Sequence, residues 1–327
     1  MTTAPLAVGV AGVGSLGFHH ARHYAALPGV RLAGVFDARP ERAAEVAARL
    51  GTRACPSLDA LLEDVAAISV VVPTPAHHDV ALAALARGRH VLVEKPLAAT
   101  IAEAEALVAA AERAGVVLQT GHIERFNRAV RAAAPHLARP RFIESDRVAP
   151  FVARGSDVAV ILDLMIHDID LVLALVREPV TDVRASGIAV VTRSIDIATA
   201  RLEFASGAVA NLTASRLARE RVRKLRIFQP NGYFSLDLGA GTVEYLRLRK
   251  DAAAVLAGAA PDLEAAVERV PLEAPEADAL QLELASFVRA VRGEEPPAVT
   301  GRDGLEALRL AFRVLEAMGP ATAGQLS

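Results

Sequence analysis

The chain of 327 residues is poor in several residue types that mark particular protein classes. Its one cysteine, Cys55, excludes an internal disulfide and a zinc site built from cysteines. The net charge of −2 gives no basic surface for nucleic acid or an anionic membrane. Residues 1–5 lack the basic region of a signal peptide, and no stretch reaches the ~18 apolar residues of a membrane span. We therefore expect a cytoplasmic protein that binds neither nucleic acid nor membranes and holds no metal.

Lysine is also scarce, because only Lys95, Lys224 and Lys250 stand among 36 basic residues. A lysine that survives such a bias toward arginine is expected to titrate or to supply a compact point charge, which arginine does not do. Hydrophobic residues make up 53% of the chain and charged residues 23%, as in a globular protein with a large core. The length suits two domains.

A glycine motif follows the first apolar run. Residues 6–11 read as a buried parallel strand, and the motif Gly12-Val13-Gly14-Ser15-Leu16-Gly17 leads into a helix over residues 18–27. The next strand, residues 31–36, ends at Asp37, which lies 20 residues beyond Gly17. In this setting the glycines let the backbone approach a pyrophosphate at the helix N-terminus, and the acid binds the ribose hydroxyls. A carboxylate at Asp37 repels a 2′-phosphate, so NAD is favoured over NADP, although Arg39 and Arg42 weaken that preference.

Strands and helices then alternate in the manner of a doubly wound parallel sheet. The expected strands are residues 67–72, 90–93 and 116–120, and the expected helices are 41–50, 58–64, 76–87 and 101–114. Because parallel strands end at one edge, the residues that follow them should line one ligand crevice. These candidates for cofactor binding are Gly12, Gly14, Ser15, Leu16, Gly17, Asp37, Pro73, Thr74, Glu94, Lys95 and His122. The dinucleotide-binding domain is predicted over residues 1–122.

The pattern changes in residues 123–327, which we expect to form a second domain for substrate binding and oligomerisation. A helix capped by Asn127 should reach residue 137, and a strand should cover residues 141–148. About six strands of an open, largely antiparallel sheet are then expected at residues 182–192, 197–204, 208–215, 222–229, 233–238 and 242–249. Residues 261–275 should form a loop, and helices over 277–291 and 303–317 could pack back on the first domain. One sheet face should be covered by a helix and the other by a second subunit.

That covering helix is predicted over residues 158–173, with residue 156 or 157 as its N-cap. Asp163, His167 and Asp170 fall at i, i+4 and i+7, so an α-helix places them on one stripe. The other positions are mostly apolar, as in a buried helix. Two interpretations are open: the acids pair within the structure and the histidine is a satisfied core residue, or the stripe faces a wet cleft and performs chemistry.

Lys95 and His167 fit the second interpretation. Lys95 follows a central strand in a Glu-Lys-Pro turn, where its ammonium could stabilise a developing alkoxide, although a plain surface lysine is the alternative. His167 is a natural general base near neutral pH, and Asp163 can orient it or bind the substrate.

These residues together resemble the glucose–fructose oxidoreductase/inositol dehydrogenase (Gfo/Idh/MocA) family over essentially the whole chain. The resemblance implies a Rossmann domain followed by an α/β sheet domain. It also implies oxidation of a secondary hydroxyl of a sugar or polyol with NAD, and a catalytic group of Lys95, Asp163 and His167. Residues 121–127 and 162–170 look like a bacterial subgroup that acts on C3 of UDP-N-acetylglucosamine, a nucleotide sugar for lipid A synthesis. Arg128 departs from the proline expected there.

A nucleotide-sugar substrate requires cations for its diphosphate. Arg154 and the run Arg219, Arg221, Arg223, Lys224 and Arg226 are candidates, although the run also fits a solvated strand face. Arg125 is a further candidate that could equally form a structural salt bridge, and Asp168, off the stripe, should be structural. The proposed substrate-binding set is therefore Arg125, Arg154, Asp163 and His167. Dehydrogenation of a free polyol, inositol or sugar phosphate is an alternative, and a non-catalytic NAD-binding regulator is another. A homodimer or homotetramer is expected.

Overall fold

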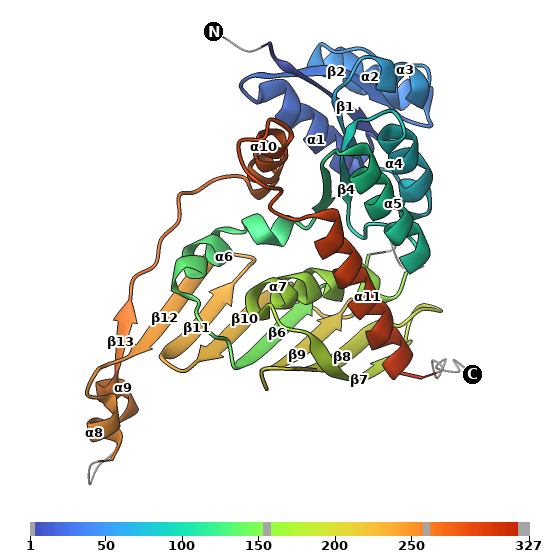
Figure 1. Cartoon of the computed structure of the whole chain (residues 1–327). Helices are drawn as coiled ribbons and strands as arrows, with labels where there is room; N and C mark the ends of the chain where they lie inside the picture. Colours follow the sequence, from blue (N-terminus) through green and yellow to red (C-terminus); the bar gives the residue numbers. More distant parts are fainter. Residues whose placement is uncertain (1–3, 153–157, 258–261, 320–327) are drawn as a thin grey trace. The chain divides into compact units, whose positions relative to one another are not determined.

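The computed structural model describes residues 4–152, 158–257 and 262–319, and its contacts divide the chain into two units. Unit 1 comprises Met1–Ile123 and Ala277–Arg309, and unit 2 comprises Glu124–Glu276 and Leu310–Ser327. Each unit is built around one sheet (Figure 1). The α/β architecture predicted from the sequence, a parallel sheet followed by a largely antiparallel one, is confirmed.

Unit 1 contains a five-stranded parallel sheet with the order β2-β1-β3-β4-β5. Its strands are β1 (Leu6–Ala11), β2 (Val30–Phe36), β3 (Ala67–Val70), β4 (His90–Glu94) and β5 (Leu118–Gly121). Its main helices are α1 (Ser15–Ala26), α2 (Pro40–Leu50), α3 (Leu58–Glu63), α4 (His77–Leu85), α5 (Ile101–Ala114) and α10 (Ala279–Val291). The sequence predicted each of these elements, with differences of a few residues at their ends. The largest is α1, which begins at Ser15 inside the glycine motif and three residues before the predicted start.

The core of unit 1 includes a helix from the end of the chain. Leu280, Leu284 and Phe287 of α10 are buried in the same apolar cluster as Tyr24 of α1 and Val10 of β1. The spacing of these α10 residues puts them on one helix face. The Asp278 side chain caps α10 by accepting hydrogen bonds from two backbone N–H groups of its first turn.

Unit 2 contains an eight-stranded sheet with the order β13-β12-β11-β10-β6-β9-β8-β7. The strands are β6 (Phe142–Val148), β7 (Val180–Ile188), β8 (Ile197–Phe204), β9 (Val209–Ser215), β10 (Val222–Gln229), β11 (Gly232–Asp237), β12 (Thr242–Leu248) and β13 (Val267–Val270). Neighbours are antiparallel except β6 and β9, which pair in parallel. The helices include α6 (Arg128–Ala133), α7 (Ile166–Val176), α8 (Ala252–Leu256), α9 (Leu263–Ala266) and, shared with unit 1, α11 (Gly301–Ala317).

The prediction of about six strands was wrong in two places. Strand β6 joins the sheet between β10 and β9, and its partners lie more than 60 residues away in the sequence, so no local pattern indicated its position. The predicted loop over residues 261–275 contains β13, which pairs with residues 245–248 of β12. Prolines on both sides of this four-residue strand concealed it.

Strand β7 ends at Ile188, whereas the sequence suggested a strand to residue 192. The backbone N–H groups of Val190, Val191 and Thr192 instead donate to the carboxylate of Asp196, at 2.8, 2.7 and 2.9 Å. Because these hydrogen bonds hold the loop around the buried Asp196 carboxylate, residues 190–192 do not continue the strand.

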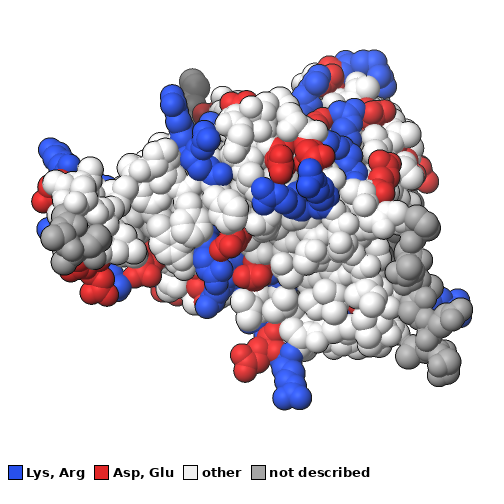
Figure 2. All heavy atoms as spheres, turned by 90° about the horizontal axis from the view of Figure 1, so that it is seen from below, with Lys and Arg blue, Asp and Glu red and all other residues white. Residues whose placement is uncertain are grey.

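The two faces of the large sheet differ. In β6 and β10, alternate residues such as Ile143, Leu225 and Ile227 are buried, and α7 packs on this side against β6 and β9. Figure 1 shows α6 and α7 on that same side, and no helix of the described residues covers the opposite one. Figure 2 views the molecule from the uncovered side, where uncharged residues form much of the surface.

The predicted helix over residues 158–173 is not a continuous α-helix. A π-helical turn, η4 (Ile161–Met165), precedes α7, which starts at Ile166. A π turn contains one more residue than an α turn, so the i, i+4, i+7 stripe does not continue across it. The predicted N-cap at residue 156 or 157 lies outside the described residues.

Candidate active site

The glycine loop after β1 has the geometry of a dinucleotide-binding turn. Gly12 has φ +84°, and a Cβ there would lie 2.5 Å from the Val71 carbonyl oxygen. A Cβ on Gly17 would overlap the Gly12 carbonyl oxygen, so the helix packs directly on the turn. Gly14 differs, because a Cβ there would meet nothing within 4 Å. The chain's own packing does not require glycine at residue 14, whereas close approach of a pyrophosphate does.

Asp37 is held beside this loop. Its Oδ2 accepts a hydrogen bond from the Val13 N–H at 2.9 Å, and its Oδ1 accepts one from the Arg39 N–H at 3.0 Å. A carboxylate retains further lone pairs for ribose hydroxyls. Arg42 is engaged by the loop itself, because its Nε donates to the Val13 carbonyl at 2.7 Å. The Arg39 side chain is 69% exposed, and its Nε lies 3.4 Å from Asp37 Oδ1.

The loops after β3 and β4 are joined by a histidine that the sequence analysis missed. His77 is buried; its Nδ1 lies 2.8 Å from the Pro96 carbonyl oxygen and its Nε2 2.9 Å from that of Val72. This side chain therefore lies between the turn containing Lys95 and the loop containing Pro73 and Thr74, and in its neutral form it donates to one of the two carbonyls. The Lys95-Pro96 peptide bond is cis. The signal available in the sequence was a histidine two residues after Pro75, at a helix start.

The remaining predicted cofactor residues follow the same edge of the sheet but differ in exposure. Glu94 ends β4, and His122 follows β5, which pairs with β4 in parallel register. His122 is fully buried, and Glu94 is largely buried, with Oε1 3.0 Å from Nε2 of the buried His20. The backbone at these positions lines the strand-end edge, while the two side chains point into the unit.

In unit 2, the π turn and α7 carry Asp163 and His167, both half-buried. Asp170, predicted on the same stripe, is fully buried and accepts two hydrogen bonds from Arg125, at 2.7 and 2.8 Å. The salt-bridge interpretation of Arg125 is therefore realised. Asn127, as predicted, caps α6, and its side chain accepts from the Ala129 N–H. Arg154 lies outside the described residues.

Asp168 belongs to a buried charge cluster behind His167. Arg147 of β6 donates to both of its carboxylate oxygens at 2.7 and 2.8 Å, and to Glu124 at 2.8 Å. All three residues are buried, so the structural role expected for Asp168 is confirmed. Arg147 and Glu124 were not predicted from the sequence as part of this site. Arg147 lies within β6 and Glu124 follows β5, and neither segment has a charge pattern that links it to α7.

The arginine-rich run of β10 is divided by strand alternation. Arg223 lies on the side of α7, with its Nη1 3.7 Å from Glu124. Arg226 and Lys224 lie on the opposite side, where Arg226 pairs with Glu144 at 3.2 Å. Of the three members of the run that lie in β10, Arg223 is therefore the one on the same face of the sheet as α7.

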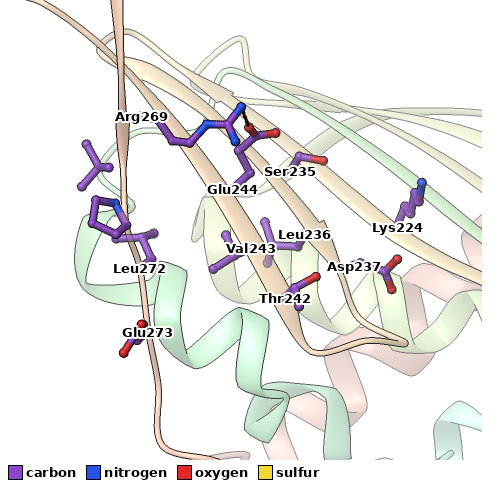
Figure 3. Close-up of a pocket in the computed structure, with 12 residues that line it drawn as sticks. Lys224, Ser235, Leu236, Asp237, Thr242, Val243, Glu244, Arg269, Leu272 and Glu273 are labelled. Atoms are coloured by element: carbon purple, nitrogen blue, oxygen red, sulfur yellow. Dashed lines mark ion pairs between the residues drawn. The ribbon is translucent and has the colours of Figure 1, made fainter.

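A groove of about 490 Å³ lies at the far end of the large sheet (Figure 3). Strands β10 to β12 and residues 269–273 line it, and Arg269 forms an ion pair with Glu244 at 2.6 Å. Lys224, a candidate for the diphosphate, is among its lining residues, but none of the residues predicted for cofactor binding or catalysis is, so we assign the groove no role in catalysis.

Two absences can be stated for the described residues. They contain no group of three or more His, Cys, Asp or Glu side chains placed to hold a metal ion. None of their helices is both long and apolar enough to cross a membrane.

Comparisons with known proteins agree with this geometry. Residues 6–122 match a family model described as "Oxidoreductase family, NAD-binding Rossmann fold", and residues 129–235 match the "GFO/IDH/MocA C-terminal domain". UDP-N-acetylglucosamine 3-dehydrogenase of Acidithiobacillus ferrooxidans is 42% identical, over 94% of this chain and 95% of that one. A solved structure of UDP-N-acetylglucosamine 3-dehydrogenase from A. ferrooxidans has a TM-score of 0.87 at 41% identity, covering 96% and 98% of the two chains. Myo-inositol 2-dehydrogenase of Thermotoga maritima is 29% identical over 93% and 94%.

Proposed function

Because the chain belongs to the Gfo/Idh/MocA family of NAD-binding oxidoreductases, we propose that it is a nucleotide-sugar dehydrogenase that oxidises UDP-N-acetylglucosamine at C3. The observation that carries this proposal is the match along nearly the whole length to UDP-N-acetylglucosamine 3-dehydrogenase of A. ferrooxidans, at 42% identity. The segments around His122 and His167 that suggested this substrate lie within that match. We place the enzyme in the cytoplasm, where nucleotide sugars are made.

NAD, when bound, accepts the hydride released from the substrate carbon. The residues that fit it are those of the strand-end edge: the glycine loop over residues 12–17, Asp37, Pro73, Thr74, Glu94, Lys95 and His122. The open space beside Gly14 and the carboxylate held beside the loop support this assignment.

For the catalytic group we propose Lys95, Asp163 and His167. His167 removes the hydroxyl proton, and the Lys95 ammonium stabilises the alkoxide that develops on that oxygen before the carbon gives up its hydride. Asp163, one turn before His167, orients the imidazole or binds the substrate. Two observations support this group. His77 contacts the turn that contains Lys95, and Asp163 lies in a π turn, a feature common at functional sites.

For the substrate, we propose that Arg154 contacts the diphosphate. Arg125, held in place by its bidentate ion pair with Asp170, is the second residue of this proposed diphosphate site. Loss of a contact remote from the reacting carbon should raise KM for the nucleotide sugar more than it lowers kcat.

The test is a substrate screen with the purified protein and NAD, followed by NADH absorbance. UDP-N-acetylglucosamine, other UDP-sugars and myo-inositol form three arms, the last because of the T. maritima relative. Lys95→Ala and His167→Ala should each lower kcat by about 100-fold or more. Turnover of myo-inositol alone would favour the polyol alternative, and no turnover in any arm would favour the regulator.

A further inference from the structure

A buried pair, His20 and Glu94, lies immediately beside Lys95, and the proposed mechanism does not use it. His20 belongs to α1 and is fully buried, and Glu94 is the last residue of β4. His20 Nε2 lies 3.0 Å from Glu94 Oε1. Since an ionised carboxylate only accepts, His20 donates from Nε2.

The Glu94 carboxylate is fixed from three directions. His20 donates to Oε1, and the backbone N–H of Lys95 donates to Oε2 at 3.3 Å. On the third side a Cβ on Gly121 would come within 2.9 Å of Oε1, so the glycine at the end of β5 leaves the space that the carboxylate occupies. If the Glu94 side chain were flexible, it would need neither the donor on α1 nor the space beside the glycine on β5.

The carboxylate is also charged. Burial alone would raise the pKa of Glu94, but the hydrogen bond and charge of His20, and then the charge of Lys95, lower it below its usual value. Its other titratable neighbours are Tyr24 of α1 and His77 of α4. Burial raises the pKa of the Tyr24 hydroxyl and lowers the pKa of the His77 imidazole, so both side chains are neutral near pH 7. A buried anion is costly without a counter-charge, and the permanent cation acting on Glu94 is Lys95.

We propose that Glu94 and His20 are positioning residues: His20 fixes the Glu94 carboxylate, which holds the Lys95 backbone N–H and keeps a negative charge beside the Lys95 side chain. The inference rests on the proposed catalytic role of Lys95. It gives the Glu94 side chain a task directed inward, while the backbone at Glu94 lines the strand-end edge proposed for NAD.

The test measures Lys95 directly, by competitive acetylation of the full chain across a pH series with peptide mass spectrometry, without substrate or cofactor. Glu94→Gln removes the charge and keeps the shape. Loss of a neighbouring anion disfavours the ammonium, so the acetylation profile of Lys95 should move to lower pH by about one unit, a roughly tenfold gain in reactivity at fixed pH. His20→Leu should shift the profile in the same direction by less.

Two further variants separate positioning from general damage. In His20→Gln the amide nitrogen stands near the place of Nε2, so the profile should return toward that of the wild type. His90→Gln is the matched control, because His90 lies at the other end of β4, where its Nδ1 accepts from the Val117 N–H at 3.0 Å. Its Lys95 profile should be unchanged.

Kinetics supply the second readout. Glu94→Gln should lower kcat by tenfold or more and move the alkaline limb of the kcat profile to lower pH, with KM and the Kd for NAD within about threefold. An unshifted Lys95 acetylation profile in Glu94→Gln and His20→Leu, or an equal shift in His90→Gln, would overturn the inference. A wild-type enzyme without turnover would contradict the proposed function, while acetylation would still decide this inference.

Discussion

At the scale of single residues, we expect Asp37 to decide the cofactor preference. Its carboxylate is held beside the glycine loop, and a 2′-phosphate would meet this negative charge. We expect NAD to bind at least tenfold more tightly than NADP, and Asp37→Ser to reduce that ratio. Titration of the protein with each cofactor, followed by calorimetry, measures this ratio. Because Arg42 is engaged by the Val13 carbonyl, equal binding of NADP by the wild type would identify Arg39 as the phosphate ligand.

Asp196 makes a second residue-scale prediction, about pH and stability. Burial alone would raise its pKa, but the hydrogen bonds from Thr192, Val191 and Val190 lower it from 3.8 to about 2. A depressed pKa in the folded state adds stability above pH 4, which is lost as the pH falls toward 2. Asp196→Asn should therefore cost about 2 kcal/mol at neutral pH and less at low pH.

Urea unfolding at a series of pH values checks this, with Asp182→Asn as the control. Asp182 is on the neighbouring strand β7 and pairs with Arg184, but both side chains are well exposed. Such a pair contributes little, and the control should stay within about 0.5 kcal/mol of the wild type. A uniform loss for Asp196→Asn at every pH would show that its effect is packing rather than charge.

At the scale of elements, local signals explain which parts of the fold were predictable. Helix α5 was predicted with both ends correct, because Thr100 and Glu103 form a capping box and Gly115 ends the helix with a left-handed conformation. The glycine loop and Asp37 were equally readable, since their chemistry depends on spacing along the chain. Strand β13 and the position of β6 were not, because they depend on partners distant in sequence.

The candidate site shows the same division. Lys95, Asp163 and His167 were predicted from lysine scarcity and helical spacing, but the residues that contact their segments were not predicted. His20, His77 and Arg147 reach these segments from other elements, and a single sequence does not show which side chains meet across a core. The π turn was also hidden, because residues 158–173 satisfy an α-helical pattern as well.

The link between α7 and the sheet gives an element-scale prediction. Arg147→Ala leaves the buried carboxylates of Asp168 and Glu124 without their cation, and it should lower the free energy of unfolding by about 3–5 kcal/mol. Arg226→Ala is the control from the opposite face of the sheet, where the pair with Glu144 is about 39% exposed. Its cost should stay below about 1 kcal/mol. Equal costs in urea unfolding would mean that burial does not distinguish the two pairs.

At the scale of the whole molecule, the uncovered face of the large sheet is the surface where we expect contact with a partner. Alternate residues of β6, β10 and β11 point to that face, including Phe142, Phe228 and Tyr233. The ring centroids of Phe228 and Phe142 are 6.0 Å apart, and those of Phe228 and Tyr233 are 4.7 Å apart. Aromatic side chains gathered on an exposed sheet are typical of protein interfaces.

We predict that this face joins copies of the chain into a homodimer or homotetramer, because a symmetric contact would bury the same aromatic residues on both sides. Light scattering at micromolar concentration should give the mass of an oligomer for the wild type. Phe228→Glu should shift it to a monomer, since the contact would bury two unpaired carboxylates. Leu263→Glu, at a site of α9 that is 65% exposed, controls for the added charge and should leave the mass unchanged. A monomeric wild type would instead mean that the mixed polar and aromatic character of this face is compatible with solvent.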